Sequence, residues 1–278
     1  MTIKETQEKK TIVVAPTFHS SFQASICQQL RNWFGPKEMA LRSVTDNADL
    51  QKNHLELILK QANPAALITI SVRPDSETVA AYHSANVPII LIDEEKEGVS
   101  TITTDNYLGG FLAGKHLITM GRKNIAIVSG KTQVEGGYNA AQRLDGFQQA
   151  LTASHLSISP DCAIEVDHYS REDGIATMPK LISKGLDAIF CAAGDNCALG
   201  LLSIAKEKGV KIPEDIAILG FDDLLVARVS SPTLTTIKQP LEKIAEAAYK
   251  MAVIQRKEII NTPEKVVFEP ELVVRQSA

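Results

Sequence analysis

The amino-acid sequence predicts a doubly wound α/β fold, in which helices cover both faces of parallel sheets. Two observations lead to this class. Short runs rich in Val, Ile, Leu and Ala recur along the chain without polar alternation, as expected of strands that are buried on both faces. Helical patterns lie between these runs, and parallel strands need such crossover connections. Ligands of such a fold are expected beyond the carboxyl ends of the strands.

Six runs are predicted to be strands of parallel sheets. In chain order they are Ile12–Ala15, Ala66–Ile70, Pro88–Ile92, Ile125–Val128, Ala188–Cys191 and Ile216–Leu219. Their composition is nearly continuous in apolar residues, which favours the interior of a sheet over a half-exposed edge.

Eight segments between and after these strands are predicted to be helices. They are Ser21–Phe34, Ala48–Gln61, Asp75–Ala85, Asn106–Met120, Asn139–Ala153, Gly174–Ser183, Cys197–Lys208 and Leu241–Arg256. In the fourth, the apolar residues fall on one stripe, and Gly121 follows at the position of a left-handed C-terminal cap. No long linker separates the segments, so two lobes would share the chain through crossovers.

Composition and charge narrow the class of protein. The 278 residues are 44% hydrophobic and 22% charged, which is typical of a folded globular chain. The net charge of -4 argues against a broad basic face for nucleic acid. No apolar run could span a bilayer and the first residues do not resemble a signal peptide, which predicts a soluble cytoplasmic protein without a membrane partner. The four cysteines form no CxxC pair and are expected to be buried thiols.

The sequence shows no motif for catalysis, metal binding or a cofactor. Gly109, Gly114 and Lys115 have Walker A spacing, but His116 stands where a Ser or Thr is required. The residues between them belong to a predicted helix, so no phosphate loop can form. The six histidines lack any close ligand spacing, and no GxSxG motif occurs. We therefore expect no catalytic residue, no metal and no cofactor.

Two carboxylates and one guanidinium are better candidates for a binding site. Asp195 and Asp222 follow the fifth and sixth predicted strands, so both lie at the carboxyl edge of a sheet, where they can accept hydrogen bonds from a ligand. Alternatively, each caps the helix that follows it. Arg143 shares a helix face with Asn139, four residues earlier, and the alternative for Arg143 is a solvated surface charge.

Eight short motifs occur in a specific order in the last two thirds of the chain. They are TDN at 104–106, GRKNIAI at 121–127, RLDGF at 143–147, DNCALG at 195–200, GVKIPEDI at 209–216, GFDD at 220–223, SPTLTTIKQP at 231–240 and ELVVRQS at 271–277. In this order they resemble the effector-binding region of the LacI/GalR family of transcription regulators. Residues 11 to 102 match the same pattern more loosely.

The resemblance implies a periplasmic binding protein-like type I fold of two Rossmann-like lobes with a ligand cleft between them. One lobe would be residues 10–102 plus 240–267, and the other 103–239 plus 268–278. The cleft positions that carry over are Ser21 and Phe22 from the first lobe, Asn139, Arg143, Tyr169, Asp195 and Asp222 from the second, and Gln239 at a crossover. Judged alone, the two aromatic residues could equally be core. Such a set of groups suits a sugar or another small polar effector.

Two departures from the family pattern leave the identity of the effector open. Gly194 stands where many sugar-binding members have Asn, and Gly137 where purine-binding relatives have Arg. The resemblance also implies a homodimer. It further implies operator DNA contacted through an N-terminal helix-turn-helix, which this sequence does not contain. We expect that segment upstream in the parent reading frame of a regulator, more often a repressor than an activator. The alternatives are a freestanding solute-binding protein of a transport system and, with less support, an α/β enzyme.

Overall fold

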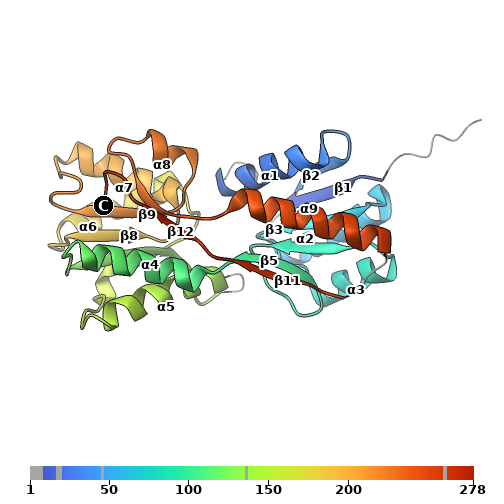
Figure 1. The fold of residues 1–278 in the computed structure, drawn as a ribbon, viewed down its shortest axis with the longest axis horizontal. Coiled ribbons are helices and arrows are strands. Elements are labelled where there is room, and N and C mark those ends of the chain that lie inside the picture. The colour runs from blue at the N-terminus through green and yellow to red at the C-terminus, as the bar shows by residue number, and fades with distance from the viewer. Residues whose placement is uncertain (1–8, 17–20, 45–46, 135–136, 259–261) are drawn as a thin grey trace, which may run out of the picture. The chain divides into compact units, whose positions relative to one another are not determined.

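A computed structural model describes residues 9–16, 21–44, 47–134, 137–258 and 262–278. The chain divides into two compact units, each with its own six-stranded sheet (Figure 1). The first unit ends at Thr103 and takes up Leu241–Phe268, while the second comprises Thr104–Pro240 and Glu269–Ala278. The α/β class predicted from the apolar runs is confirmed.

The sheet of the first unit has the strand order β11-β5-β4-β3-β1-β2. Its strands are β1 (Thr11–Ala15), β2 (Met39–Ser43), β3 (Ala66–Ile70), β4 (Ile89–Ile92), β5 (Ser100–Thr104) and β11 (Lys265–Phe268). The strands from β5 to β2 pair in parallel, with Ile12 of β1 opposite Leu67 of β3. Their carboxyl ends therefore share one edge.

Helices cover both faces of this first sheet (Figure 1). The helices are α1 (Ser21–Phe34), α2 (Ala48–Leu57) with a π-helical turn at Ile58–Ala62, α3 (Ser76–Ser84) and α9 (Leu241–Glu258). Val13 of β1 packs in the core with α1 and α9, while its neighbour Ile12 packs with α2 and α3. Successive side chains of a strand point to opposite faces, so the run Ile12–Ala15 of β1 is buried on both sides and is continuously apolar.

The sheet of the second unit has the strand order β12-β10-β9-β8-β6-β7. Its strands are β6 (Ile125–Gly130), β7 (Ala163–Val166), β8 (Ala188–Cys191), β9 (Ala217–Asp222), β10 (Thr235–Lys238) and β12 (Glu271–Val273). All pairs are parallel except the edge strand β12, which runs antiparallel to β10. The second sheet is therefore mixed, which the sequence did not predict.

Helices α4 and α5 cover one face of this sheet, and α6 and α7 the other. The elements are α4 (Asn106–Thr119), α5 (Tyr138–Thr152), a 3-10 turn at Pro160–Cys162, α6 (Arg171–Ile182), α7 (Asp195–Glu207) and the short α8 (Leu225–Val229). A Cβ on Gly110 would lie 2.0 Å from the carbonyl oxygen of Arg143, and one on Gly146 would lie 1.9 Å from that of Tyr107. The backbones of α4 and α5 therefore approach closely. The two glycines of the Walker-like spacing are packing residues as well, because a Cβ on Gly109 would lie 2.8 Å from the Phe221 ring and one on Gly114 would lie 2.7 Å from the Cβ of Ala150.

Six strands escaped the prediction, namely β2, β5, β7, β10, β11 and β12. They are short and carry Thr, Lys, Glu or Arg, so their residues show no continuous apolar run. Helix α6 begins at Arg171, three residues before the predicted start, because Ser170 and Asp173 form a capping box. Within the described ranges, no helix is both long and apolar enough to cross a bilayer.

Candidate functional site

Arg143 of α5 is buried at the second sheet, with 7% of its surface exposed. Its Nε donates to Asn106 Oδ1 (2.7 Å) and its Nη1 to the carbonyl oxygen of Ala192 (2.8 Å). The guanidinium carbon lies 3.6 Å from the ring centroid of Phe221. No carboxylate among the described residues forms an ion pair with it. The alternative of a solvated surface charge is wrong, and the buried cation has only neutral partners.

Asn106, the first residue of α4, holds this guanidinium in place and was missed by the sequence analysis. Its side chain is fully buried. Besides accepting from Arg143, it donates through Nδ2 to the carbonyl oxygen of Thr104 (3.0 Å) and to Asn139 Oδ1 (3.0 Å). Its two side-chain partners lie 33 and 37 residues away in the chain, so no local sequence pattern predicts these contacts.

Asp222 ends β9 and is 8% exposed. Its Oδ1 accepts from Gln239 Nε2 (2.7 Å), and Gln239 Oε1 accepts from Thr104 Oγ1 (2.6 Å). Asn106 bonds to the backbone carbonyl oxygen of Thr104, so a network that passes through Thr104 links Arg143 to Asp222. The network contains four of the predicted contact residues, namely Asn139, Arg143, Asp222 and Gln239.

Gly194 precedes α7 and leaves room beside the carboxylate of Asp222. Its φ of +97° lies in a region that side chains rarely adopt, and a Cβ there would lie 2.9 Å from Asp222 Oδ2. The family departure at this position therefore has a local cause, because an Asn would be strained and would crowd Asp222 as it lies here.

Asp195 is completely buried and uses both carboxyl oxygens within the chain. Oδ1 accepts from Thr236 Oγ1 (2.6 Å) and Oδ2 from the amide of Leu224 (2.7 Å). The capping alternative is wrong for this residue, since α7 starts at Asp195 itself and Gly194 is its N-cap. Burial, reinforced by the negative charge of Asp222, raises the pKa of Asp195 well above its usual range.

The three other predicted residues have different surroundings. Tyr169 follows β7 with φ 55° and is 43% exposed. Its ring packs against Gly130, since a Cβ on Gly130 would lie 1.7 Å from the phenol oxygen. Phe22 is half-buried and packs against the core beneath α1 and α9, as its core alternative expects. Ser21 starts α1, but its side chain lies outside the described part of the structure.

The first unit has a polar cluster at the carboxyl edge of its own sheet. Ser71 follows β3 and Asp93 follows β4, with φ of 52° and 66°, and Ser71 Oγ donates to Asp93 Oδ2 (2.8 Å). Gln23 of α1 donates to Ser71 Oγ at 3.5 Å, while its Oε1 is buried with no partner among the described residues. The position of Asp93 directly after an apolar strand was a signal that the sequence analysis did not use.

The structure also shows what these groups can do chemically. Across the part of the chain that is described, no three His, Cys, Asp or Glu side chains come together as a metal site. The clusters offer fixed hydrogen-bond donors and acceptors at strand ends, which is an arrangement suited to binding a polar molecule.

Comparison with known proteins identifies the family. The periplasmic binding protein-like domain matches residues 115–278. The HTH-type transcriptional repressor PurR of Histophilus somni (strain 129Pt) is 31% identical over 241 residues, which cover 85% of this chain and 71% of that protein.

Two solved structures share the fold. A LacI family transcriptional regulator from Enterococcus faecium with bound ribose has a TM-score of 0.85 at 23% identity and covers 97% of this chain and 98% of its own. A periplasmic binding protein/LacI transcriptional regulator from Alkaliphilus metalliredigens complexed with D-xylulofuranose has a TM-score of 0.84 at 24% identity, covering 97% and 99%. The chain therefore belongs to the periplasmic binding protein-like family and is the effector-binding region of a LacI-type transcription regulator.

Proposed function

We propose that this region senses a small polar effector, such as a sugar, and thereby controls the DNA binding of the regulator. The observation that carries the proposal is the buried guanidinium of Arg143, which has no carboxylate partner among the described residues. An unpaired buried charge is unfavourable, so an acceptor brought by the effector would stabilise it. Its Nη2, which has no acceptor in the described part of the chain, is the atom that would donate.

The other groups at the strand ends complement this donor. Asp222 can accept hydrogen bonds from hydroxyl groups, and the exposed ring of Tyr169 can stack on a sugar face. Ser71 and Asp93 would supply polar contacts from the first unit. We propose that the two units close on the effector, that Gln239 holds Asp222 in place, and that Asn139 holds Arg143 through Asn106. The solved relatives with ribose and with D-xylulofuranose support a sugar or a similar polyol.

Binding would act on DNA through the differential affinity of the effector for two closure states, which is typically worth about 1–3 kcal/mol. The proposal includes a repressor that works as a cytoplasmic homodimer, contacts operator DNA through an N-terminal helix-turn-helix and performs no chemistry on the effector. The relative named as a repressor supports this role. Leu225 and Val229 of α8 are 73% and 71% exposed and lie four residues apart, so they form an apolar surface that suits a second copy of the chain.

A thermal-shift screen tests the proposal. The panel contains D-ribose, D-xylulose, cellobiose, xylitol and adenosine. A compound at a hundred times its Kd stabilises the folded chain by about 2.7 kcal/mol, which raises the Tm by several degrees. Arg143→Met should reduce the stabilisation to about half or less, because a loss of at least tenfold in affinity leaves the compound at no more than about ten times its Kd. Arg256→Met, on an exposed site of α9, should retain the full shift. No shift with any compound, or an equal shift in the Arg143 variant, contradicts the proposal.

A further inference from the structure

Two consecutive residues after β9 have backbone conformations that side chains rarely adopt. Asp222 has φ 107° and Asp223 has φ 56°. Each such conformation typically costs about 1–3 kcal/mol and persists only where the surrounding structure fixes it. The carboxylate of Asp222 therefore depends on groups that hold this turn.

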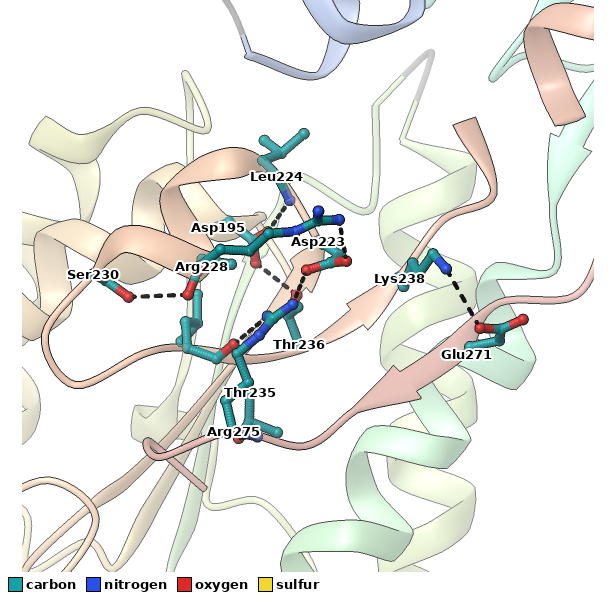
Figure 2. Close-up of polar contacts among 12 residues, drawn as sticks. Asp195, Asp223, Leu224, Arg228, Ser230, Thr235, Thr236, Lys238, Glu271 and Arg275 are labelled. Atoms are coloured by element: carbon teal, nitrogen blue, oxygen red, sulfur yellow. Dashed lines mark hydrogen bonds and ion pairs between the residues drawn. The ribbon is translucent and has the colours of Figure 1, made fainter. Parts of the chain in front are cut away.

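Asp195 braces the turn from α7 (Figure 2). Its Oδ2 accepts from the amide of Leu224, the second residue after Asp222, and its Oδ1 accepts from Thr236 of β10. A Cβ on Gly220 would lie 2.4 Å from Oδ1, so the carboxyl group packs directly on the backbone of β9. This one side chain joins the start of α7 to β9, β10 and the turn.

The turn is held on its other sides by charged and amide groups. Asp223 pairs with Arg275 and with Arg228, and the Asp223 side chain is only 3% exposed (Figure 2). Arg275 also donates to the carbonyl oxygen of Leu234 (2.7 Å). Gln239 bonds to Asp222 itself. The backbone amide of Gln239 also donates to the carbonyl oxygen of Asp222 (3.4 Å). Asp195 is the member of this set whose side chain bonds to the backbone of the turn, at the Leu224 amide.

We propose that Asp195 is a positioning residue that holds Asp222 in its binding orientation and is not itself a contact of the effector. Both oxygens of Asp195 are used and neither reaches the surface, which leaves nothing for an effector to touch. The inference rests on the proposed function, in which Asp222 accepts hydrogen bonds from the effector. An amide of the same shape can replace the carboxyl group, because its oxygen can accept from the Leu224 amide and its NH2 group can donate to the Thr236 hydroxyl.

Three variants and one control test this role. Asp195→Ala removes both hydrogen bonds and leaves the buried Leu224 amide without an acceptor. Asp195→Asn can accept from Leu224 and donate to the hydroxyl of Thr236. Thr236→Val removes only that hydroxyl, and it replaces Asp195→Ala in the test if the alanine variant does not fold. The matched control is Tyr82→Phe, which removes one buried hydrogen bond, to the carbonyl oxygen of Leu55, in the first unit.

The first measurement is made without an effector. Crystal structures and amide hydrogen exchange should show that Asp195→Ala displaces the Asp222 carboxylate and exposes the Leu224 amide to exchange, while Asp195→Asn leaves both as in the wild type. An unmoved Asp222 in the alanine variant overturns the proposal.

The second measurement is calorimetric titration with D-ribose, D-xylulose and cellobiose. Affinity should fall at least tenfold in Asp195→Ala, fall less in Thr236→Val, and stay within threefold of wild type in Asp195→Asn and Tyr82→Phe. Equal losses in Asp195→Ala and Asp195→Asn would instead make Asp195 a direct contact and overturn the proposal. If the wild-type chain binds none of these sugars or the other panel compounds, the proposed function fails, and the crystal structures still decide whether Asp195 positions Asp222.

Discussion

Replacing Arg143 with methionine separates its contribution to binding from its contribution to stability. Methionine has a similar length and no charge, so the variant removes the guanidinium without leaving a large cavity. Arg143 lies against the ring of Phe221 and donates to Asn106 and to the carbonyl oxygen of Ala192. These contacts set the size of the expected effects.

The effects on stability oppose each other. Two buried acceptors, on Asn106 and Ala192, lose their donors, which costs about 1–3 kcal/mol each, and the ring contact with Phe221 is worth about 0.5–2 kcal/mol. In the opposite direction, the variant no longer carries the desolvation penalty of an unpaired buried cation, which stabilises the folded state by several kcal/mol. We therefore expect the free energy of unfolding to change by less than about 3 kcal/mol. Loss of one charge-assisted hydrogen bond to the effector, about 1.5–3 kcal/mol, should weaken binding by about 10- to 150-fold.

Urea denaturation and calorimetric titration with the panel compound that gives the largest thermal shift measure the two quantities. Arg256→Met is the control, because the same chemical change at an exposed site of α9 should leave the Kd unchanged. An Arg143→Met variant that binds within twofold of wild type would refute the role given to the buried guanidinium.

Three further predictions concern packing, protonation and thiols. Gly146→Ala should lower the free energy of unfolding by about 1–3 kcal/mol or more in urea, since its Cβ would lie 1.9 Å from the Tyr107 carbonyl oxygen; an unchanged midpoint contradicts the close approach of α4 and α5. The folded chain binds the proton of Asp195 more tightly than the unfolded chain, because its pKa is raised. The stability of wild type should therefore fall as pH rises above about 4 toward that raised pKa, and Asp195→Asn should not share this loss. The native protein should resist a thiol reagent at pH 8 and should react at four sites in urea. All four cysteines are buried, and burial raises the pKa of Cys27 to about 12. Rapid labelling of the native protein would contradict this prediction.

The sequence was most informative where one kind of residue dominates a segment. β1, β3 and β8 are buried on both faces, so their residues are almost all apolar and these runs predict the strands closely. β10 has the sequence TTIK and β12 the sequence ELV, and their place is set by pairing with other strands and not by a local run. Edge strands and crossover strands are therefore the elements that a local pattern misses.

The candidate site divides in the same way. Position after a strand was enough to locate Asp222 at a sheet edge, and helical spacing was enough to associate Arg143 with Asn139. The role of Asn106 depends on partners in α5, and the burial of Asp195 depends on β10 and on the turn after β9. Such contacts arise only when distant segments pack, so the sequence alone could not distinguish a buried positioning residue from a residue that contacts the ligand.

A crystal structure of the chain with the panel compound that gives the largest thermal shift tests the central claim most directly. We predict that an oxygen of the compound lies within hydrogen-bond distance of Arg143 Nη2 and that a second polar group of the compound bonds to Asp222. A compound bound elsewhere, with Arg143 still surrounded only by its neutral protein partners, would contradict the account.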